Sequence, residues 1–120
     1  MAISSEDNEQ AMLFQWADFA ALTFPELKLM YHVPNEGKRS ISTGSRLKRL
    51  GLKSGVPDIA LPVARGGYIG LYIEMKYGRN TLTENQRIWL DMLKKAGHMT
   101  AVCYSFTEAK DVILGYLRMK

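Results

Sequence analysis

The chain has 120 residues, 47% of them hydrophobic and 23% charged, a composition typical of one globular domain, here residues 1–120. Its single cysteine, Cys103, excludes an internal disulfide framework and fits a reducing compartment. The N-terminal residues lack the pattern of a secretory signal, and no apolar run approaches the roughly 20 residues of a membrane span. We therefore expect a cytoplasmic protein with no membrane partner.

The first half of the chain predicts a helix and a strand, followed by a basic connector. Ser4 or Ser5 can cap a helix that runs to about Thr23. Residues 27–33 have the pattern of a strand, which Pro34 and the turn-prone residues 35–37 would end. A short helix is expected around residues 45–50, ending at Gly51.

The basic connector has no acidic residue between Glu36 and Asp58. Six of the 16 lysines and arginines fall within it, namely Lys38, Arg39, Arg46, Lys48, Arg49 and Lys53. Such a segment can follow a phosphate backbone, and we predict that these six residues bind DNA. An ordinary solvated surface segment explains the charge alone equally well.

The second half predicts two strands, a helix, a strand and a helix. Residues 56–63 and 68–76 have strand patterns, and the glycines of Arg65-Gly66-Gly67 favour a hairpin between them. Thr83 and Gln86 form a capping box for a helix that continues to Ala96. Residues 99–104 then predict a strand, and Ser105 caps a helix that runs nearly to Lys120. The expected fold class is α/β, a mixed central sheet flanked by helices in the order α-β-ββ-α-β-α.

Two charged residues share one face of the third predicted strand. Glu74 and Lys76 have the parity of Tyr72, whereas the apolar residues Ile73 and Met75 lie on the opposite face. A solvent-facing charged pair at a sheet edge would show the same pattern. However, Asp58 opens the neighbouring strand of the predicted hairpin, so we expect two carboxylates and one ammonium group to converge. Tyr68 and Tyr72 share this face, and we expect them to pack rather than to contact DNA.

This set of groups has the chemistry of a hydrolytic metal site. Two carboxylates with water oxygens suit a hard cation, above all Mg²⁺. Such a cation polarises a phosphate oxygen, and the neighbouring lysine can orient or deprotonate the attacking water.

Two further polar residues extend apolar helical stripes. Glu9 lies one turn before Met12 and Leu13, and Gln86 shares a face with Leu90 and Leu93. Either can support the site. Alternatively, Glu9 is exposed near the helix start, and Gln86 only completes the cap of Thr83.

Pro57-Asp58 followed by Glu74-Met75-Lys76 resembles the PD-(D/E)xK nuclease superfamily. The surrounding sequence is similar to the VRR-NUC family over nearly the whole chain. The segments that carry this resemblance, in family order, are Asn35 to Ser40, Leu47 to Gly51, Gly55 to Asp58, Ile73 to Lys76 and Thr83 to Gln86. The chain therefore looks like a stand-alone VRR-NUC domain of the kind found in phages and bacteria, which would place it in the host cytoplasm if it is phage-encoded.

The resemblance implies a restriction-endonuclease-like core and cleavage of DNA with Mg²⁺ or Mn²⁺, without a small-molecule cofactor. It implies that Asp58, Glu74 and the Met75 backbone carbonyl bind the metal and that Lys76 is the catalytic lysine. Glu9 matches the family's helix glutamate, a further metal ligand, and Gln86 its helix glutamine. Stand-alone relatives imply a homodimer acting on branched DNA such as Holliday junctions.

Two alternatives to this function stay open. One is a catalytically inactive DNA-binding module of the same fold, although the acids, the lysine and the glutamine of the family are all present. The other is a nuclease that acts on RNA or on simple linear duplex.

Overall fold

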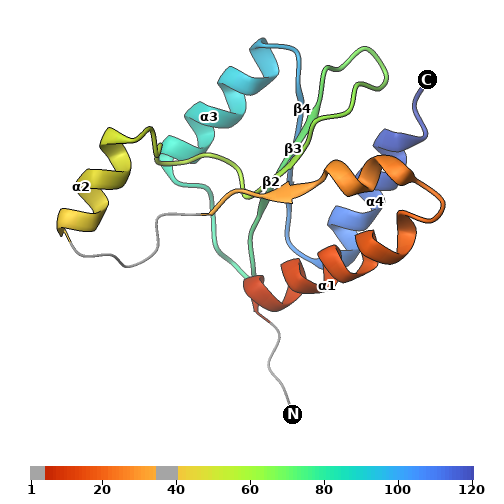
Figure 1. Cartoon of the computed structure of the whole chain (residues 1–120), viewed down its shortest axis with the longest axis horizontal. Helices are drawn as coiled ribbons and strands as arrows, with labels where there is room; N and C mark the ends of the chain where they lie inside the picture. The colour runs from red at the N-terminus through yellow and green to blue at the C-terminus, as the bar shows by residue number, and fades with distance from the viewer. Residues whose placement is uncertain (1–4, 35–40) are drawn as a thin grey trace.

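The computed structural model describes residues 5–34 and 41–120 (Figure 1). This part of the chain contains a four-stranded sheet in the order β1-β2-β3-β4, with β1 at Tyr31–His32, β2 at Ile59–Leu61, β3 at Leu71–Met75 and β4 at Met99–Cys103. The β1–β2 and β2–β3 pairs are antiparallel, and the β3–β4 pair is parallel. The helices are α1 (Glu6–Ala20), the 3₁₀ helix η1 (Pro25–Leu29), α2 (Ile41–Arg49), α3 (Glu84–Lys95) and α4 (Phe106–Leu117). The mixed α/β sheet expected from the sequence is confirmed.

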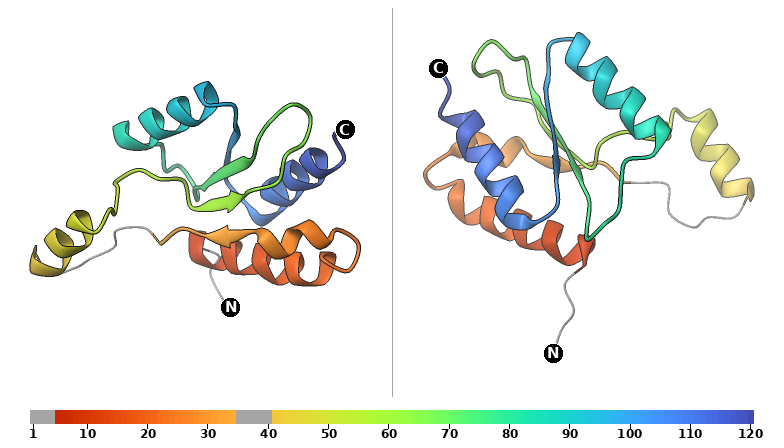
Figure 2. Two further views of the ribbon diagram at one scale, coloured as in Figure 1. Left: turned by 45° about the horizontal axis from the view of Figure 1, so that its top comes forward. Right: turned by 180° about the vertical axis from the view of Figure 1, so that it is seen from behind.

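The helices lie on both faces of the sheet. Figure 2 shows α1 and α4 together on one face and α3 on the other, while α2 projects from the body of the molecule. The apolar core fills the space between the sheet and the α1–α4 layer. It consists of one parity of each central strand and the inner faces of both helices, including Ile59, Leu61, Leu71, Ile73, Met75, Leu13, Ala17, Ile113 and Tyr116. The other parity of β2 and β3 therefore faces α3.

Capping residues begin three of the four α-helices where the sequence predicts them. The Ser5 hydroxyl accepts from the backbone N–H of Asn8 at 3.2 Å, and the Ser105 hydroxyl accepts from Glu108 at 3.1 Å. The capping box of Thr83 and Gln86 is complete. These bonds satisfy N–H groups that have no partner within a helix.

The predicted hairpin between β2 and β3 is present. Ile59 pairs with Ile73 and Leu61 with Leu71, and an isolated bridge joins Arg65 to Tyr68. Gly66 and Gly67 have φ values of 57° and 87°, which L-residues with side chains rarely adopt. Both strands are shorter than expected; residues 56–58 approach β2 outside the ladder, where Pro57 has no N–H to donate.

The prediction of a strand over residues 27–33 is wrong for most of that segment. Pro25 opens the 3₁₀ helix η1, and Leu27 donates its N–H to the Phe24 carbonyl at 3.0 Å. Leu27 and Met30 are buried at a spacing of three residues, so the apolar pattern is satisfied by a turn. Only Tyr31–His32 joins the sheet.

The other helix bounds also differ from expectation. Helix α1 ends at Ala20 rather than near Thr23, and α2 begins before residue 45, whereas α4 ends at Leu117, close to the expected end near Lys120. The turn expected at residues 35–37 lies outside the described residues, as do Lys38 and Arg39. In the described part of the chain, no helix is both long enough and apolar enough to cross a membrane.

Candidate active site

Three charged residues are buried on the sheet face that looks toward α3. Asp58, Glu74 and Lys76 have exposed fractions of only 5%, 2% and 8%. Strand parity places Glu74 and Lys76 on this face because Ile73 and Met75 point into the core. Burial of this kind is costly unless the charges have partners, so the arrangement points to a site rather than to a solvated edge.

Asp58 is fixed across the strand pair. It follows Pro57 directly before β2, and its Oδ2 accepts the backbone N–H of Met75 at 2.8 Å. The backbone oxygen of Asp58 accepts from the N–H of Val33 at 2.7 Å. The bond to Met75 brings the carboxylate of Asp58 beside that of Glu74, the convergence that the hairpin predicted.

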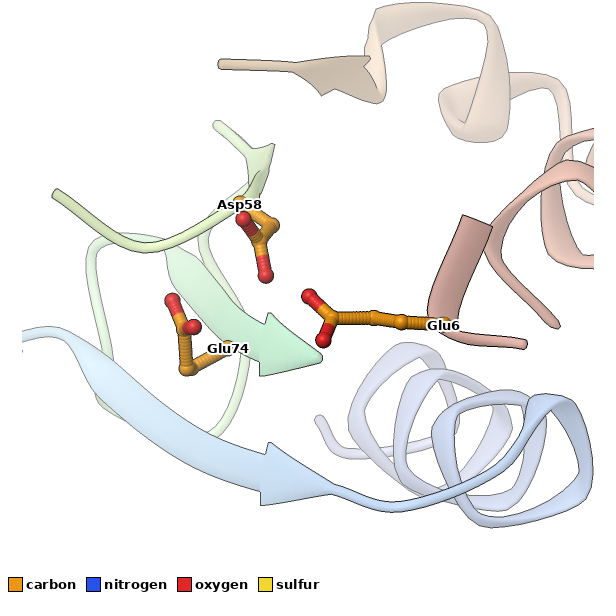
Figure 3. Close-up of side chains that lie close together, drawn as sticks. All are labelled: Glu6, Asp58 and Glu74. Atoms are coloured by element: carbon orange, nitrogen blue, oxygen red, sulfur yellow. The ribbon is translucent and has the colours of Figure 1, made fainter. Parts of the chain in front are cut away.

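A third carboxylate comes from the first turn of α1, and it belongs to Glu6. Glu6, Asp58 and Glu74 each offer a carboxylate oxygen, and these atoms all lie within 4.8 Å of one another (Figure 3). Sequence reasoning missed Glu6, although it lies three residues before Glu9 on the same helical stripe.

Glu9, the residue predicted for this role, has a different contact. Its Oε1 accepts the backbone N–H of Phe106 at 3.1 Å, so its carboxylate caps the first turn of α4. The interpretation of Glu9 as a residue that reaches inward is therefore correct, but its carboxylate contacts a helix terminus. The carboxylate of Glu6, one turn closer to the helix end, reaches the sheet.

The electrostatics of this cluster favour the binding of a cation. Burial, followed by repulsion from Asp58, raises the pKa of Glu74 to about 8. Burial also raises the pKa of Asp58 and, together with the charge of Asp58, the pKa of Glu6. Three carboxylates face one ammonium group, with Lys76 Nζ at 3.7 Å from Glu74 Oε2.

The unpaired oxygen of Glu74 tests whether a metal fits here. Oε1 of Glu74 is buried and has no hydrogen-bond partner among the described residues. Buried polar atoms are nearly always paired, and an acceptor within a cluster of oxygens suits a hard cation. Glu6, Asp58 and Glu74 therefore form a donor set that fits a divalent ion such as Mg²⁺ or Mn²⁺.

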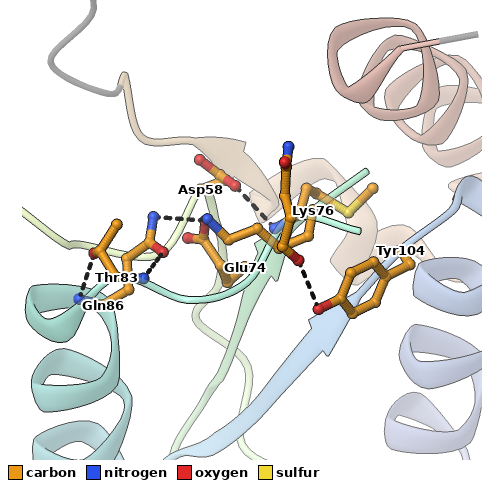
Figure 4. A network of polar contacts seen from close by, with 8 residues as sticks. Asp58, Glu74, Lys76, Thr83, Gln86 and Tyr104 are labelled. Atoms are coloured by element: carbon orange, nitrogen blue, oxygen red, sulfur yellow. Dashed lines mark hydrogen bonds and ion pairs between the residues drawn. The ribbon is translucent and has the colours of Figure 1, made fainter. Parts of the chain in front are cut away.

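Gln86 connects the site to helix α3 (Figure 4). Its Nε2 donates to Glu74 Oε2 at 3.1 Å, and its Oε1 accepts the backbone N–H of Thr83 at 2.9 Å. The sequence suggested two alternative roles for Gln86, as a helix-capping partner of Thr83 or as an amide directed into the site. The one side chain has both roles.

The family assignment agrees with this geometry. The VRR-NUC domain family model matches residues 7–107. The chain therefore belongs to the VRR-NUC domain family. It is also similar to a solved structure described as a VRR_NUC domain protein, at 28% sequence identity and a TM-score of 0.84, with 98% of this chain and 91% of that chain covered. A search of curated proteins found no match. Membership in the VRR-NUC family implies a nuclease-type function with DNA as the substrate.

In this VRR-NUC domain the carboxylates lie in a cleft of about 390 Å³. Lys53, Ser54 and Gly55 line the cleft together with Thr83 and Gln86 of the α3 N-terminus. The remaining described residues of the predicted DNA-binding set, Arg46, Lys48 and Arg49, are exposed on α2 and do not line the cleft. Of the predicted DNA-binding residues that the structure describes, Lys53 alone lines the cleft.

The cleft wall depends on a close approach at Gly55. A Cβ atom at this position would lie 2.6 Å from the carbonyl carbon and oxygen of Asn85, and the φ of Gly55 is 92°. Beside it, Asn85 Nδ2 donates to Ser54 Oγ at 3.1 Å. The absence of a side chain at Gly55 therefore lets the segment before Asp58 pack directly on the first turn of α3.

Proposed function

We propose that this protein is a divalent-metal-dependent endodeoxyribonuclease that hydrolyses phosphodiester bonds in branched DNA such as Holliday junctions. The observation that carries the proposal is the cluster of Glu6, Asp58 and Glu74 carboxylates, with the unpaired Oε1 of Glu74 and the ammonium group of Lys76 beside it. A cluster of this kind within a VRR-NUC domain supports phosphodiester hydrolysis better than a structural role, because two buried acids and a third, half-buried one without a cation weaken the fold.

Asp58, Glu74 and Glu6 would hold Mg²⁺ or Mn²⁺, and we propose the backbone carbonyl of Met75 as a further ligand. Such an ion, when bound, polarises a phosphate oxygen and lowers the pKa of a coordinated water. Oxygen ligands from three separate segments fix the position of the ion relative to the cleft, so the same carboxylates also determine where a phosphate can approach.

Lys76 and Gln86 have distinct roles in the proposal. The ammonium group of Lys76 lies 3.7 Å from Glu74 Oε2 in the lining of the cleft, where it can orient the attacking water and exchange a proton with it at Nζ. Gln86 holds Glu74 Oε2 through its side-chain N–H and so directs the other carboxylate oxygen to the cation. Gln86 is a positioning residue in this scheme.

A cleavage assay tests the proposal. Labelled Holliday junctions and linear duplexes are incubated with the protein in Mg²⁺ or Mn²⁺ and, separately, in EDTA. We expect junction cleavage that EDTA abolishes, and its loss in Asp58→Ala, Glu74→Ala and Lys76→Ala while binding of DNA persists. Full Mg²⁺-dependent activity in Glu74→Ala would overturn the proposal.

The same assay separates the rival functions. A DNA-binding module that lacks catalysis would retain the junction intact under every metal condition. A ribonuclease, or a nuclease for linear duplex, would cleave those substrates faster than the junction. The burial of Asp58, Glu74 and Lys76 together, with Gln86 bonded to Glu74, favours catalysis.

The basic connector is the proposed path for the DNA backbone. Arg46, Lys48 and Arg49 of α2 and Lys53 of the cleft lining would contact phosphates, and we propose the same role for Lys38 and Arg39. Each phosphate contact steepens the salt dependence, with log K changing by about −0.9 per contact against log salt concentration. The double variant Arg46→Ala/Arg49→Ala is therefore expected to bind DNA with a shallower salt slope, measured by fluorescence anisotropy.

A homodimer is proposed because paired cuts across a junction need two sites related by symmetry. Sedimentation equilibrium of the protein at assay concentrations tests this. A monomeric mass under those conditions would contradict it.

A further inference from the structure

Aromatic side chains occupy the sheet face next to the carboxylates. Tyr72 lies two residues before Glu74 on β3, so both side chains leave the same face of the strand. Tyr72 pairs with Ala60 of β2, and Ala60 pairs in turn with Tyr31 of β1. Tyr31 and Tyr72 therefore flank one small residue on the face that carries the site.

His98 extends this row on the other side of Tyr72. The rings of Tyr72 and His98 lie 5.0 Å apart at an interplanar angle of 90°, a favourable edge-to-face contact. Gly70 provides the space, because a Cβ there would lie 3.1 Å from His98 Nδ1. We define Tyr31, Tyr72 and His98 as the aromatic shelf.

The shelf is continuous across the strands. Ala60 is only 2% exposed although its side chain points away from the main core. Tyr31 and Tyr72 lie on either side of it in the register, which accounts for its burial. Burial raises the pKa of the Tyr72 phenol, and the nearby Tyr31 phenol raises it further, as expected for neighbouring hydroxyl groups.

The sequence predicts that Tyr72 packs within the protein. Packing alone does not explain why the aromatic shelf is partly exposed. Tyr31 is 50% exposed on the edge strand β1, and Tyr72 is half-buried. Nδ1 of His98 is buried and has no hydrogen-bond partner among the described residues. An exposed ring on the same face as a catalytic cleft presents a flat surface to whatever occupies that cleft.

We propose that the aromatic shelf stacks an unpaired base of the DNA strand whose backbone lies in the cleft. This inference rests on the proposed nuclease function and specifies its substrate, DNA with an unpaired nucleotide beside the cleavage point. A base within a duplex is covered on both faces by its neighbours, whereas an unpaired base has a free face for an aromatic ring.

The composition of the shelf fits a base better than an apolar protein segment. Two phenols and an imidazole combine ring faces with hydrogen-bonding groups, and Lys53 and Lys76 border the adjoining cleft with positive charge. A nucleotide offers the matching combination, a flat ring joined to a phosphate. The preference for unpaired DNA would therefore come from the same sheet face that positions Glu74.

The test uses 2-aminopurine, a fluorescent base that is quenched when it stacks. It is placed as a single unpaired base at the branch of a labelled junction, or within a fully paired duplex, and fluorescence and affinity are measured in EDTA. We expect quenching of the unpaired probe by the wild-type protein. Tyr31→Ala should abolish the quenching and weaken binding of this DNA by about tenfold. Tyr31→Phe, which keeps the ring, should retain both.

Tyr68→Ala is the matched control. Tyr68 is an exposed tyrosine in the hairpin turn, near Tyr116 rather than near the cleft, so its removal should leave quenching unchanged. Unaltered quenching in Tyr31→Ala, or an equal loss of affinity for the paired duplex, would overturn the proposal. Because the readout needs no cleavage, failure of the stacking proposal can be distinguished from failure of the nuclease proposal. That proposal fails separately if no DNA is cut in Mg²⁺ or Mn²⁺.

Discussion

Gln86 donates its side-chain N–H to Glu74 Oε2 at 3.1 Å, linking the first turn of α3 to the buried carboxylate of β3. The same amide accepts the backbone N–H of Thr83 at 2.9 Å. The orientation of Glu74 is therefore tied to the N-terminus of a helix. Since Oε2 also faces Lys76, Oε1 is the oxygen directed to a cation.

Gln86→Glu isolates the bond to Glu74. The new carboxylate still accepts the N–H of Thr83, but it replaces a donor to Glu74 with a like charge. We expect metal affinity or cleavage to fall about 10- to 100-fold, as is usual when a group that orients a ligand is lost. Cleavage rates over a Mg²⁺ series measure this. Thr83→Ala serves as the stability control, since it removes the cap at a cost of about 1 kcal/mol. A wild-type rate in Gln86→Glu would contradict the positioning role.

Glu6 and Glu9 are distinguished by separate substitutions. Glu6→Ala removes one carboxylate of the cluster, so we expect the affinity for Mn²⁺ to fall by about tenfold or more in calorimetric titration. Glu9→Ala removes the acceptor for Phe106 and should lower the free energy of unfolding by about 1–3 kcal/mol while metal affinity persists. If Glu9→Ala lowered the affinity for Mn²⁺ while Glu6→Ala left it unchanged, Glu9 rather than Glu6 would be the ligand.

The stability of the metal-free protein should fall as the pH rises. The pKa of Glu74 is about 8 in the folded state, against an ordinary value of 4.5, so the folded state binds more protons between these limits. The stabilisation is complete below about pH 4.5 and is lost as the pH passes through about 8. Urea unfolding in EDTA over this range measures the slope.

Two controls belong to this pH experiment. Glu74→Gln should reduce the slope, because the amide does not ionise; the raised pKa values of Asp58 and Glu6 contribute to the slope that remains. Added Mg²⁺ should raise the melting temperature more at pH 8 than at pH 6, because a cation bound only by the folded state stabilises it. A metal-free stability that increases with pH would contradict the buried, like-charged cluster.

Gly55→Ala tests the contact between the cleft wall and α3. The substitution adds strain at a φ of 92° and a collision with the backbone of Asn85, so it should destabilise the fold and displace the segment that leads to Asp58. Gly67→Ala is the matched control, because its φ is 87° but a Cβ there meets nothing within 4 Å. We expect Gly67→Ala to cost about 1–2 kcal/mol with cleavage intact, and Gly55→Ala to cost more and to reduce cleavage. If the two substitutions had equal effects on stability and cleavage, the contact of Gly55 with Asn85 would not be the cause of the loss.

Local patterns predicted most of the fold and the centre of the candidate site. The period-two alternation along β3 separates Glu74 from Ile73, and the glycines after Arg65 identify the hairpin that brings Asp58 alongside. The caps at Ser5, Thr83 and Ser105 follow from side-chain chemistry that acts over three residues. These features need no knowledge of distant contacts.

Features that depend on distant contacts were less accessible from the sequence. Glu6 and Glu9 lie one turn apart on the same stripe, and only the position of α4 assigns Glu9 to Phe106 and leaves Glu6 for the sheet. Likewise, the apolar residues between Leu27 and Val33 allow a strand, and the burial of Leu27 with Met30, which indicates a 3₁₀ turn, depends on the neighbouring layers. The contact of Gly55 with Asn85 joins two segments whose packing no local pattern shows.

The parallel pairing of β3 with β4 has a consequence for when activity can arise during synthesis. Parallel neighbours cannot be joined by a tight turn, so the chain must leave the sheet after Met75 and return through a long crossover, which here contains α3. The backbone N–H of Lys76 donates to the Cys103 carbonyl at 2.8 Å, and Gln86 lies within the crossover. A nascent chain that has emerged only as far as Lys76 holds all three carboxylates but neither contact. Cleavage competence should therefore arise only after β4 has left the ribosome.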